Sequence, residues 1–206
     1  MKKRFRYICS KYPLVLASAS PRRKRLLKQV GLPFRALSTR VDEDRETGKP
    51  QIVVQRLAEK KARAASGRGG DGWILGADTA VVMGEKVLGK PADRMDAAAM
   101  LSALSGREHR VITGFCLLDP SGRAVHSEAV ITRVRFKWLT REEIQGYVDT
   151  GEPFGKAGGY AIQGIGAFLV EGITGSYTNV VGLPVCAVIQ ALLGVGALRT
   201  FPLGGL

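Results

Sequence analysis

The chain has 206 residues, of which 45% are apolar and 24% are charged, so neither a disordered chain nor a fibrous repeat accounts for it. Lys and Arg outnumber Asp and Glu by 31 to 18, and the resulting formal net charge of +13 favours anionic partners. Three scattered cysteines argue against a disulfide framework or a structural zinc site, and two histidines leave little material for a histidine-based catalytic cluster.

Short apolar runs alternate with amphipathic segments along the chain, a pattern typical of α/β proteins. Residues 14–17 predict a strand, and Ser20 with Pro21 predicts the start of a helix that ends at Gly31. Basic residues fill positions 22–25 in the first turn of this helix, where the helix dipole disfavours positive charge. A bound anion at the helix start would offset that cost, and a merely basic surface helix is the alternative.

The next segments predict a second helix followed by two short strands. The spacing of apolar and small residues predicts the helix from about residue 50 to 65. Residues 73–76 and 80–83 have the composition of strands, and they flank Asp78 and Thr79. We therefore expect Asp78 to follow the end of a strand, where aspartate is a common turn former.

A third helix and two long strands come next. Asp93 is a suitable cap for a helix over residues 94–104, and strands are predicted near residues 110–118 and 124–139. The second of these strands alternates apolar and basic side chains, so that one face is apolar and the other is basic. The basic positions are Arg133, Arg135 and Lys137.

The last part of the chain combines a capped helix with a glycine-rich stretch. Thr140 and Glu143 form the pattern of a capping box for a helix that ends at about residue 148. After the glycine-rich stretch, residues 167–171 predict a strand, and Pro184 begins the last helix.

Two lysines lie in loops that contain glycine or proline rather than on helix faces. Lys90 stands in a Gly-Lys-Pro sequence and Lys156 in a Gly-Lys-Ala-Gly sequence. Such loops let a backbone approach phosphate groups closely. The P-loop pattern is absent, because Lys156 is followed by alanine rather than Ser or Thr. Together with the basic helix start, these loops favour a phosphate chain with several charges as the partner.

Eight short stretches resemble, in the same order, the motifs of the Maf family of nucleoside triphosphate pyrophosphatases. The resemblance extends from about residue 13 to residue 195. The matching stretches lie at residues 16–23, 26–27, 57–62, 76–79, 89–91, 156–158, 162–164 and 179–184. Any one of these motifs is weak, whereas eight in sequence are specific.

The resemblance implies a fold, a domain organisation and a reaction. The fold is an elongated α/β architecture with a mixed, strongly curved sheet and flanking helices, similar to that of inosine triphosphatase. Residues 1–206 are expected to form a single Maf-like domain whose two lobes flank a central cleft. The implied reaction is hydrolysis of a nucleoside triphosphate to the monophosphate and pyrophosphate, in a nucleotide housecleaning role, with Mg²⁺ or Mn²⁺ as cofactor.

The resemblance also implies roles for individual residues. Asp78 takes the position of a general base or metal ligand that prepares the attacking water, Glu43 that of a second metal-holding carboxylate, and Lys90 that of a catalytic cation. Cations already in place would stabilise the charge that develops on the leaving oxygens. The expected substrate-binding residues are Ser20, Arg22, Arg23, Lys61, Thr79, Lys156 and Gln163.

Three of these residues bear on the base of the nucleotide. Arg22, Thr79 and Gln163 stand at the positions that mark the branch of the family acting on dTTP and UTP. A glutamine side chain offers one donor and one acceptor to the amide edge of thymine or uracil, and bonding to the loop backbone is the alternative. The chain departs from the family at Gly155, where aspartate is common, so the rate or metal dependence is expected to differ.

The resemblance implies a homodimer, and the unpaired cysteines fit a reducing cytoplasm. The apolar run at residues 13–17 is too short for the apolar region of a signal peptide. The uncharged segment at 180–198 is interpreted as a strand end followed by a buried helix rather than as a membrane span. A nucleic-acid-binding or septum-formation regulatory protein with a vestigial nucleotide cleft is the rival hypothesis. It draws on the basic strand face and on basic residues 2–4 and 6. No base-stacking motif accompanies these residues, so no specific nucleic acid is expected.

Overall fold

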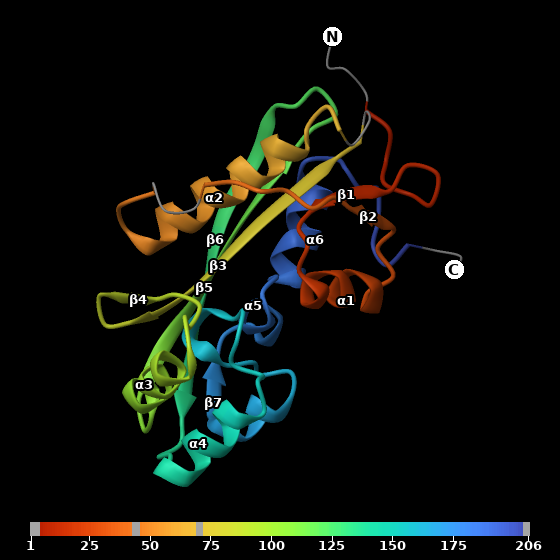
Figure 1. Ribbon diagram of the computed structural model, residues 1–206. Helices are drawn as coiled ribbons and strands as arrows, with labels where there is room; N and C mark the ends of the chain where they lie inside the picture. Colours follow the sequence, from red (N-terminus) through yellow and green to blue (C-terminus); the bar gives the residue numbers. More distant parts are fainter. Residues whose placement is uncertain (1–4, 43–45, 69–71, 204–206) are drawn as a thin grey trace. The chain divides into compact units, whose positions relative to one another are not determined.

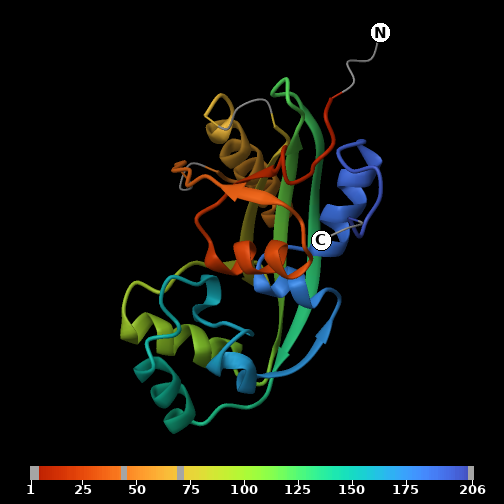
Figure 2. The ribbon, with the colours of Figure 1, turned by 90° about the vertical axis from the view of Figure 1, so that its right-hand side faces the viewer.

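The computed structural model describes residues 5–42, 46–68 and 72–203 (Figures 1 and 2). The chain divides into two compact units, each assembled from separate stretches of sequence. Unit 1 consists of Met1–Asp78, Thr113–Val130 and Gly182–Leu206, and unit 2 consists of Thr79–Ile112 and Ile131–Val181. The expected single domain with two lobes around a cleft stays a prediction.

The strands form one mixed sheet. They are β1 (Leu14–Ala17), β2 (Phe34–Ala36), β3 (Ile74–Met83), β4 (Lys86–Leu88), β5 (Glu108–Leu118), β6 (Ala124–Phe136) and β7 (Val170–Thr174). Among the described residues the strand order is β2-β1-β3-β5-β6-β7, with β4 paired to β3. β1 pairs in parallel with β2 and β3, whereas β4 is antiparallel to β3 and β7 is antiparallel to β6. The predicted α/β class with a mixed sheet is confirmed.

Six α-helices accompany the sheet in the described part of the chain. They are α1 (Pro21–Gln29), α2 (Pro50–Ala65), α3 (Arg94–Leu104), α4 (Arg141–Asp149), α5 (Tyr177–Val181) and α6 (Val185–Gly194). None of the helices within residues 5–42, 46–68 and 72–203 has both the length and the apolar character that crossing a membrane requires.

Two predicted helix starts are confirmed by their capping hydrogen bonds. At α3, Asp93 Oδ1 accepts the backbone N–H of Asp96 at 2.8 Å. At α4, Thr140 Oγ1 accepts the N–H of Glu143 at 3.2 Å, and Glu143 Oε2 accepts the N–H of Thr140 at 3.0 Å. Local sequence therefore sets where these helices begin.

The predicted break in the strand at Asp78 is wrong. β3 runs without interruption from Ile74 to Met83. β1 pairs with it as far as Gly76, and β4 pairs with it from Val81 onward. Hydrogen bonds to neighbouring strands hold the backbone extended and override the local preference of aspartate for turns. Asp78 thus lies in the middle of a strand.

The predicted strand at residues 167–171 is displaced toward the carboxyl end. Ile165–Leu169 forms a 3₁₀ helix, and the strand β7 begins at Val170. Glycine-rich sequence precedes the 3₁₀ helix, and Gly164 has a φ of +152°, which turns the chain away from an extended path. The apolar composition of the segment reflects the burial of Leu169 rather than the period of a strand.

Helix α2 lies directly against the first half of β3 in unit 1 (Figure 1). Its buried face includes the small residues Ala58, Ala62 and Ala65. A Cβ at Gly76 would lie 2.0 Å from the carbonyl oxygen of Ala58, so only glycine permits this approach. The helix backbone therefore rests on the strand backbone at this point.

The core of unit 2 gathers apolar side chains from α3, α4 and strands, and α3 and α4 lie side by side (Figure 2). Leu101, Phe136 and Tyr147 are among its buried residues. His109 joins this core with its Nε2 atom 2.7 Å from the hydroxyl of Tyr160. Burial lowers the pKa of His109 to about 4, so the ring is neutral near pH 7 and serves packing.

Gly76→Ala should lower the free energy of unfolding by about 3 kcal/mol, because the added methyl group forces α2 away from β3. Urea unfolding followed by circular dichroism measures the change. Gly146→Ala is the control, since nothing lies within 4 Å of a Cβ at this exposed position in α4, and alanine should raise stability by about 0.5–1 kcal/mol. An unchanged unfolding midpoint for Gly76→Ala would contradict the close contact.

Candidate functional site

An ion pair between α2 and β3 marks the candidate catalytic position in unit 1. Lys61 Nζ lies 2.6 Å from Asp78 Oδ1, and the two side chains expose only 12% and 14% of their areas. The other carboxylate oxygen, Asp78 Oδ2, makes no hydrogen bond or ion pair with a described residue. The structure therefore brings these two sequence-predicted residues together and leaves one oxygen of Asp78 for a proton or a cation.

The buried guanidinium of Arg23 ties together separate backbone segments of unit 1. Its Nε donates to the carbonyl oxygen of Gly182 at 2.7 Å, and its NH1 donates to that of Ala77 at 2.9 Å. NH1 also donates to Ser18 Oγ at 3.2 Å. Because Ala77 directly precedes Asp78, these bonds fix the strand backbone at the carboxylate. A contact of Arg23 with phosphate stays a prediction.

The start of α1 carries an arginine without an acidic partner. Ser20 caps the helix, and its Oγ accepts the backbone N–H of Arg23 at 3.5 Å. The first turn contains no acidic residue, and the guanidinium of Arg22 pairs with no carboxylate among the described residues. Partial burial lowers the pKa of Arg22 through desolvation but leaves the group charged. A half-buried, unpaired cation at a helix start favours an anionic ligand there.

In unit 2, a backbone hydrogen bond joins the two lysine loops. The N–H of Gly158 donates to the carbonyl oxygen of Gly89 at 2.9 Å, which brings the loops of Lys90 and Lys156 side by side. Gly158 has a φ of +71°, and a Cβ there would lie 2.9 Å from the side chain of Val81. Both the backbone conformation and the packing therefore require glycine in the Lys-Ala-Gly sequence.

The two lysines differ in their surroundings. The ammonium of Lys156 folds back on its own loop, where Nζ donates to the carbonyl oxygen of Glu152 and lies 3.5 Å from that of Phe154. Lys90 is exposed and has no ion-pair partner within residues 5–42, 46–68 and 72–203. Thr79, at the start of unit 2, is half-buried in β3.

Gln163 lies in the loop that precedes the 3₁₀ helix Ile165–Leu169. Its amide oxygen Oε1 is buried and accepts no hydrogen bond from the described residues. A buried acceptor without a donor costs about 1–3 kcal/mol, which a ligand N–H would recover. The alternative, that this side chain only satisfies loop backbone, stays a prediction, because only Oε1 of its two polar atoms is buried without a partner.

The predicted metal ligands are Asp78 and Glu43, and Glu43 lies outside the described residues. Elsewhere in the described ranges, no three His, Cys, Asp or Glu side chains gather into a cation site. Mg²⁺ commonly binds through one or two carboxylates together with substrate phosphates and water. The open oxygen of Asp78 is a carboxylate ligand of the type that Mg²⁺ uses, and a metal-binding role for Asp78 stays a prediction.

Sequence reasoning gave no individual role to two residues whose side chains join separate segments of unit 2. Asn179 is fully buried, and its Nδ2 donates to the carbonyl oxygen of Val111 at 3.0 Å and to Thr132 Oγ1 at 2.9 Å. The Glu152 carboxylate accepts the N–H groups of Ile165 and Gly166, which follow Gln163, and the hydroxyl of Tyr147. The available signal for Glu152 was a lone acidic residue within a glycine-rich stretch.

The predicted basic face of β6 and the segment after it is paired with glutamates of the same unit. Arg133 Nε lies 3.8 Å from Glu108, Arg135 Nε lies 2.8 Å from Glu171, and Lys137 pairs with Glu143. Residues 2–4 of the basic amino terminus lie outside the described residues. A polyanion would have to compete with these glutamates, so the strand face gives little support to a nucleic-acid-binding function.

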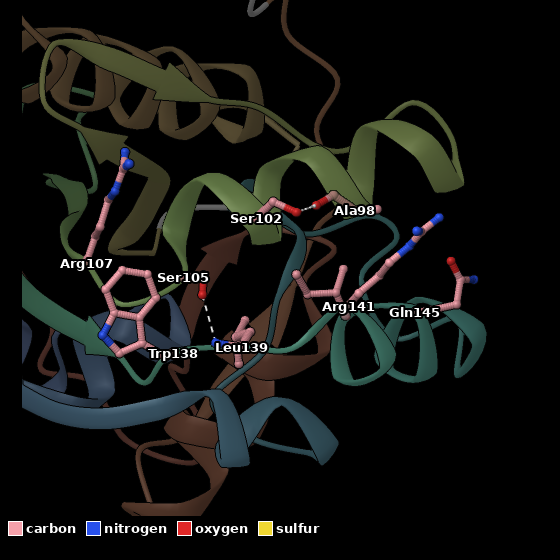
Figure 3. A pocket seen from close by; sticks show the side chains of 9 residues that line it. Ala98, Ser102, Ser105, Arg107, Trp138, Leu139, Arg141 and Gln145 are labelled. Atoms are coloured by element: carbon pink, nitrogen blue, oxygen red, sulfur yellow. Dashed lines mark hydrogen bonds between the residues drawn. The ribbon is translucent and has the colours of Figure 1, made fainter.

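A separate pocket of about 580 Å³ opens on unit 2 between α3 and α4 (Figure 3). Ser105 and Leu139 are among the residues that line it, and the Leu139 N–H donates to Ser105 Oγ at 2.7 Å. Trp138 stands at its edge with 80% of its area exposed. None of the sequence-predicted site residues lines this pocket.

Arg23→Lys should lower the free energy of unfolding by about 2–4 kcal/mol, because one ammonium cannot reproduce the bonds to both Ala77 and Gly182. Urea unfolding measures the loss. Arg25→Lys, at an exposed position of the same helix, is the matched control and should change stability by less than about 0.5 kcal/mol. Equal midpoints for the two variants would contradict the anchoring role of Arg23.

The chain is similar to proteins of known families and structures. A nucleoside-triphosphatase / dITP/XTP pyrophosphatase from Mycobacterium abscessus aligns over 90% of this chain and 96% of that chain, with a TM-score of 0.43 and 17% identity. A dTTP/UTP pyrophosphatase of Syntrophotalea carbinolica is 53% identical over 91% of this chain and 87% of its own length. Another dTTP/UTP pyrophosphatase, from Geobacter sp. strain M21, is 52% identical over 90% of this chain and 96% of its own length. Residues 13–195 match the Maf-like protein family, and the chain therefore belongs to the Maf family.

Proposed function

We propose that this protein is a nucleoside triphosphate pyrophosphatase that hydrolyses dTTP and UTP, and related modified pyrimidine triphosphates, to the monophosphate and pyrophosphate. The observation that carries the proposal is 53% and 52% identity, over about nine-tenths of the chain, to relatives named dTTP/UTP pyrophosphatase. The pairing of Lys61 with Asp78 supports it. Removal of unwanted nucleotides is the role that such a reaction serves.

Asp78 acts as the general base in the proposed reaction. Lys61 fixes Oδ1 at 2.6 Å, so Oδ2 is the oxygen that takes a proton from the attacking water. The water oxygen bonds to the α-phosphorus, the bond from that phosphorus to the bridging oxygen breaks, and pyrophosphate leaves with the electron pair. The bond from Arg23 to Ala77 keeps the strand, and with it the carboxylate, in position.

Positive groups offset the charge that builds on the leaving pyrophosphate. We propose that the phosphate-binding residues are Ser20 and Arg22 in unit 1, and Lys90 and Lys156 on the joined loops of unit 2. The unpaired state of Arg22 among the described residues supports this role, because a phosphate would supply the missing counter-charge.

A divalent cation, Mg²⁺ or Mn²⁺, is the proposed cofactor. Asp78 and Glu43 are the proposed ligands, and Oδ2 of Asp78 would bind the cation with one lone pair and accept the proton of the water with the other. When bound, the cation would neutralise phosphate charge and lower the pKa of the water that Asp78 deprotonates.

Gln163 is the proposed reader of the base, together with Thr79. Its buried Oε1 would accept the N3–H of thymine or uracil, and its amide N–H₂ would donate to a neighbouring carbonyl oxygen of the base. The alternative of nucleic-acid binding lacks comparable support, because the basic strand face is paired with glutamates. A homodimer and a cytoplasmic location remain part of the proposal. The homodimer rests on the family resemblance, and the location rests on the scattered cysteines.

Asp78→Asn should lower pyrophosphate release from dTTP about a thousandfold, because the amide cannot take the proton of the water. Release is measured with a coupled phosphate assay. Glu85→Gln is the matched control, since this exposed carboxylate lies in the turn between β3 and β4. Circular dichroism verifies that both variants fold, and retained turnover in a folded Asp78→Asn protein would reject the general base.

Removal of divalent cations with a chelator should reduce pyrophosphate release to the uncatalysed level, because the triphosphate charge is then not neutralised. Addition of Mg²⁺ or Mn²⁺ in excess of the chelator should restore it. The urea unfolding midpoint, measured with and without chelator, serves as the control for structural damage. Full turnover in the presence of the chelator would contradict the proposed cofactor.

A further inference from the structure

The carboxylate of Glu152 lies at the centre of the hydrogen bonds that shape the Gln163 loop. Oε2 accepts the N–H of Gly166 at 2.8 Å, and Oε1 accepts the N–H of Ile165 at 3.1 Å. Oε2 also accepts the hydroxyl of Tyr147 at 2.8 Å. One side chain thus receives three donors, two of them from the backbone that immediately follows Gln163.

The loop presses closely against this carboxylate. A Cβ at Gly164 would lie 2.1 Å from Glu152 Oε1, so no side chain fits between the loop and the carboxylate. Gly164 also has a φ of +152°, a conformation that glycine adopts without strain. The residue next to Gln163 is therefore fixed against Glu152 both by packing and by its backbone conformation.

Tyr147 supports the other side of the same loop. It is buried with 2% of its area exposed, and its hydroxyl oxygen accepts the N–H of Ala161 at 3.1 Å while it donates to Glu152. Burial, followed by the hydrogen bond to Glu152, raises the pKa of Tyr147 and keeps the hydroxyl protonated as a donor. Tyr147 and Glu152, joined by their own hydrogen bond, thus hold the backbone on both sides of Gln163, at residue 161 and at residues 165–166.

Glu152 is linked to the phosphate-binding side of unit 2 as well. Its backbone carbonyl oxygen accepts the ammonium of Lys156. The same residue therefore orients one of the proposed phosphate-binding cations and the loop of the proposed base reader.

A fixed loop matters because a glutamine amide can suit two kinds of base. With Oε1 toward the base it accepts the N3–H of thymine, and turned over it would offer cytosine two equally good bonds. Selectivity therefore requires surroundings that hold the amide in one orientation. The bonds of Glu152 supply such a constraint for the loop of Gln163.

We propose that Glu152 is a positioning residue that sets the base selectivity of the enzyme by holding the Gln163 loop in one conformation. The inference rests on the proposed function, since it concerns how that reaction distinguishes its substrates. The carboxylate already accepts three donors of its own chain, so it acts through Gln163 rather than by touching the nucleotide.

Glu152→Gln tests the proposal, because it keeps the size of the side chain but replaces an acceptor oxygen by an N–H₂ group that opposes a backbone N–H. The ratio of kcat/KM for dTTP to that for CTP should fall about tenfold, with KM for dTTP rising more than kcat falls. Pyrophosphate release measured with both nucleotides gives the ratio. Equal losses on dTTP and CTP would overturn the proposal, since a merely structural defect lowers both alike.

Two further variants sharpen the test. Glu171→Gln is the matched control, because this exposed carboxylate of unit 2 pairs with Arg135 at the surface and should leave the ratio unchanged. Gln163→Ala should itself lower the ratio, and adding Glu152→Gln to it should cause no further fall if Glu152 acts through Gln163. A second fall of the same size in the double variant would overturn the proposal.

Tyr147→Phe carries the same test if Glu152→Gln does not fold. It removes the hydroxyl that donates to Glu152 and keeps the ring in the core. The dTTP to CTP ratio should fall in this variant as well, and an unchanged ratio in the folded protein would contradict the positioning role. A parent protein that releases no pyrophosphate from dTTP would reject the proposed function and this inference together, whereas a dTTP preference that survives Glu152→Gln rejects the inference alone.

Discussion

The approach of the α2 backbone to the β3 backbone is the constraint on which the candidate site depends. Glycine at position 76 leaves room for the carbonyl oxygen of Ala58. The buried face of α2 includes alanines, whose short side chains let the helix backbone come close to the strand. Lys61, on the same helix, then lies within 2.6 Å of Asp78, two residues beyond Gly76 on the strand. A bulkier helix face would hold the ammonium farther from the carboxylate, so the chemistry of the pair is set by packing several residues away.

The basic side chains of this protein have different roles, which depend on how buried they are and on which groups they contact. Arg23 uses its guanidinium to hold backbone carbonyl groups, and Arg135 is matched by a glutamate at the surface. Arg22 and Lys90 find no carboxylate among the described residues. The net charge of +13 is therefore a weaker guide to ligand binding than the positions of the cations that lack a carboxylate partner. Arg22 and Lys90, two of the residues proposed to bind phosphate, are among the cations of the described residues that lack such a partner.

Local sequence predicted correctly the helix starts that are fixed by hydrogen bonds between residues close in sequence. The caps at Asp93 and at Thr140 with Glu143 marked helix starts correctly, because their hydrogen bonds join residues three apart. The continuity of β3 through Asp78 could not be predicted this way, since distant strands impose it. The family motifs predicted Asp78 and Lys61 as site residues. The hydrogen bonds of Glu152 could not be predicted from local sequence, because they form only when residues 165 and 166 fold back onto its carboxylate.

Because the two units are interleaved along the chain, they limit how the protein can be truncated or recombined with a relative. The chain passes from one unit to the other four times. Three of these boundaries fall inside β3, β5 and β6, and the fourth follows the end of α5. Neither unit corresponds to one uninterrupted stretch of the gene, so a truncation that removes one also removes pieces of the other. No single crossover between two relatives can therefore exchange one unit intact and leave the other unchanged.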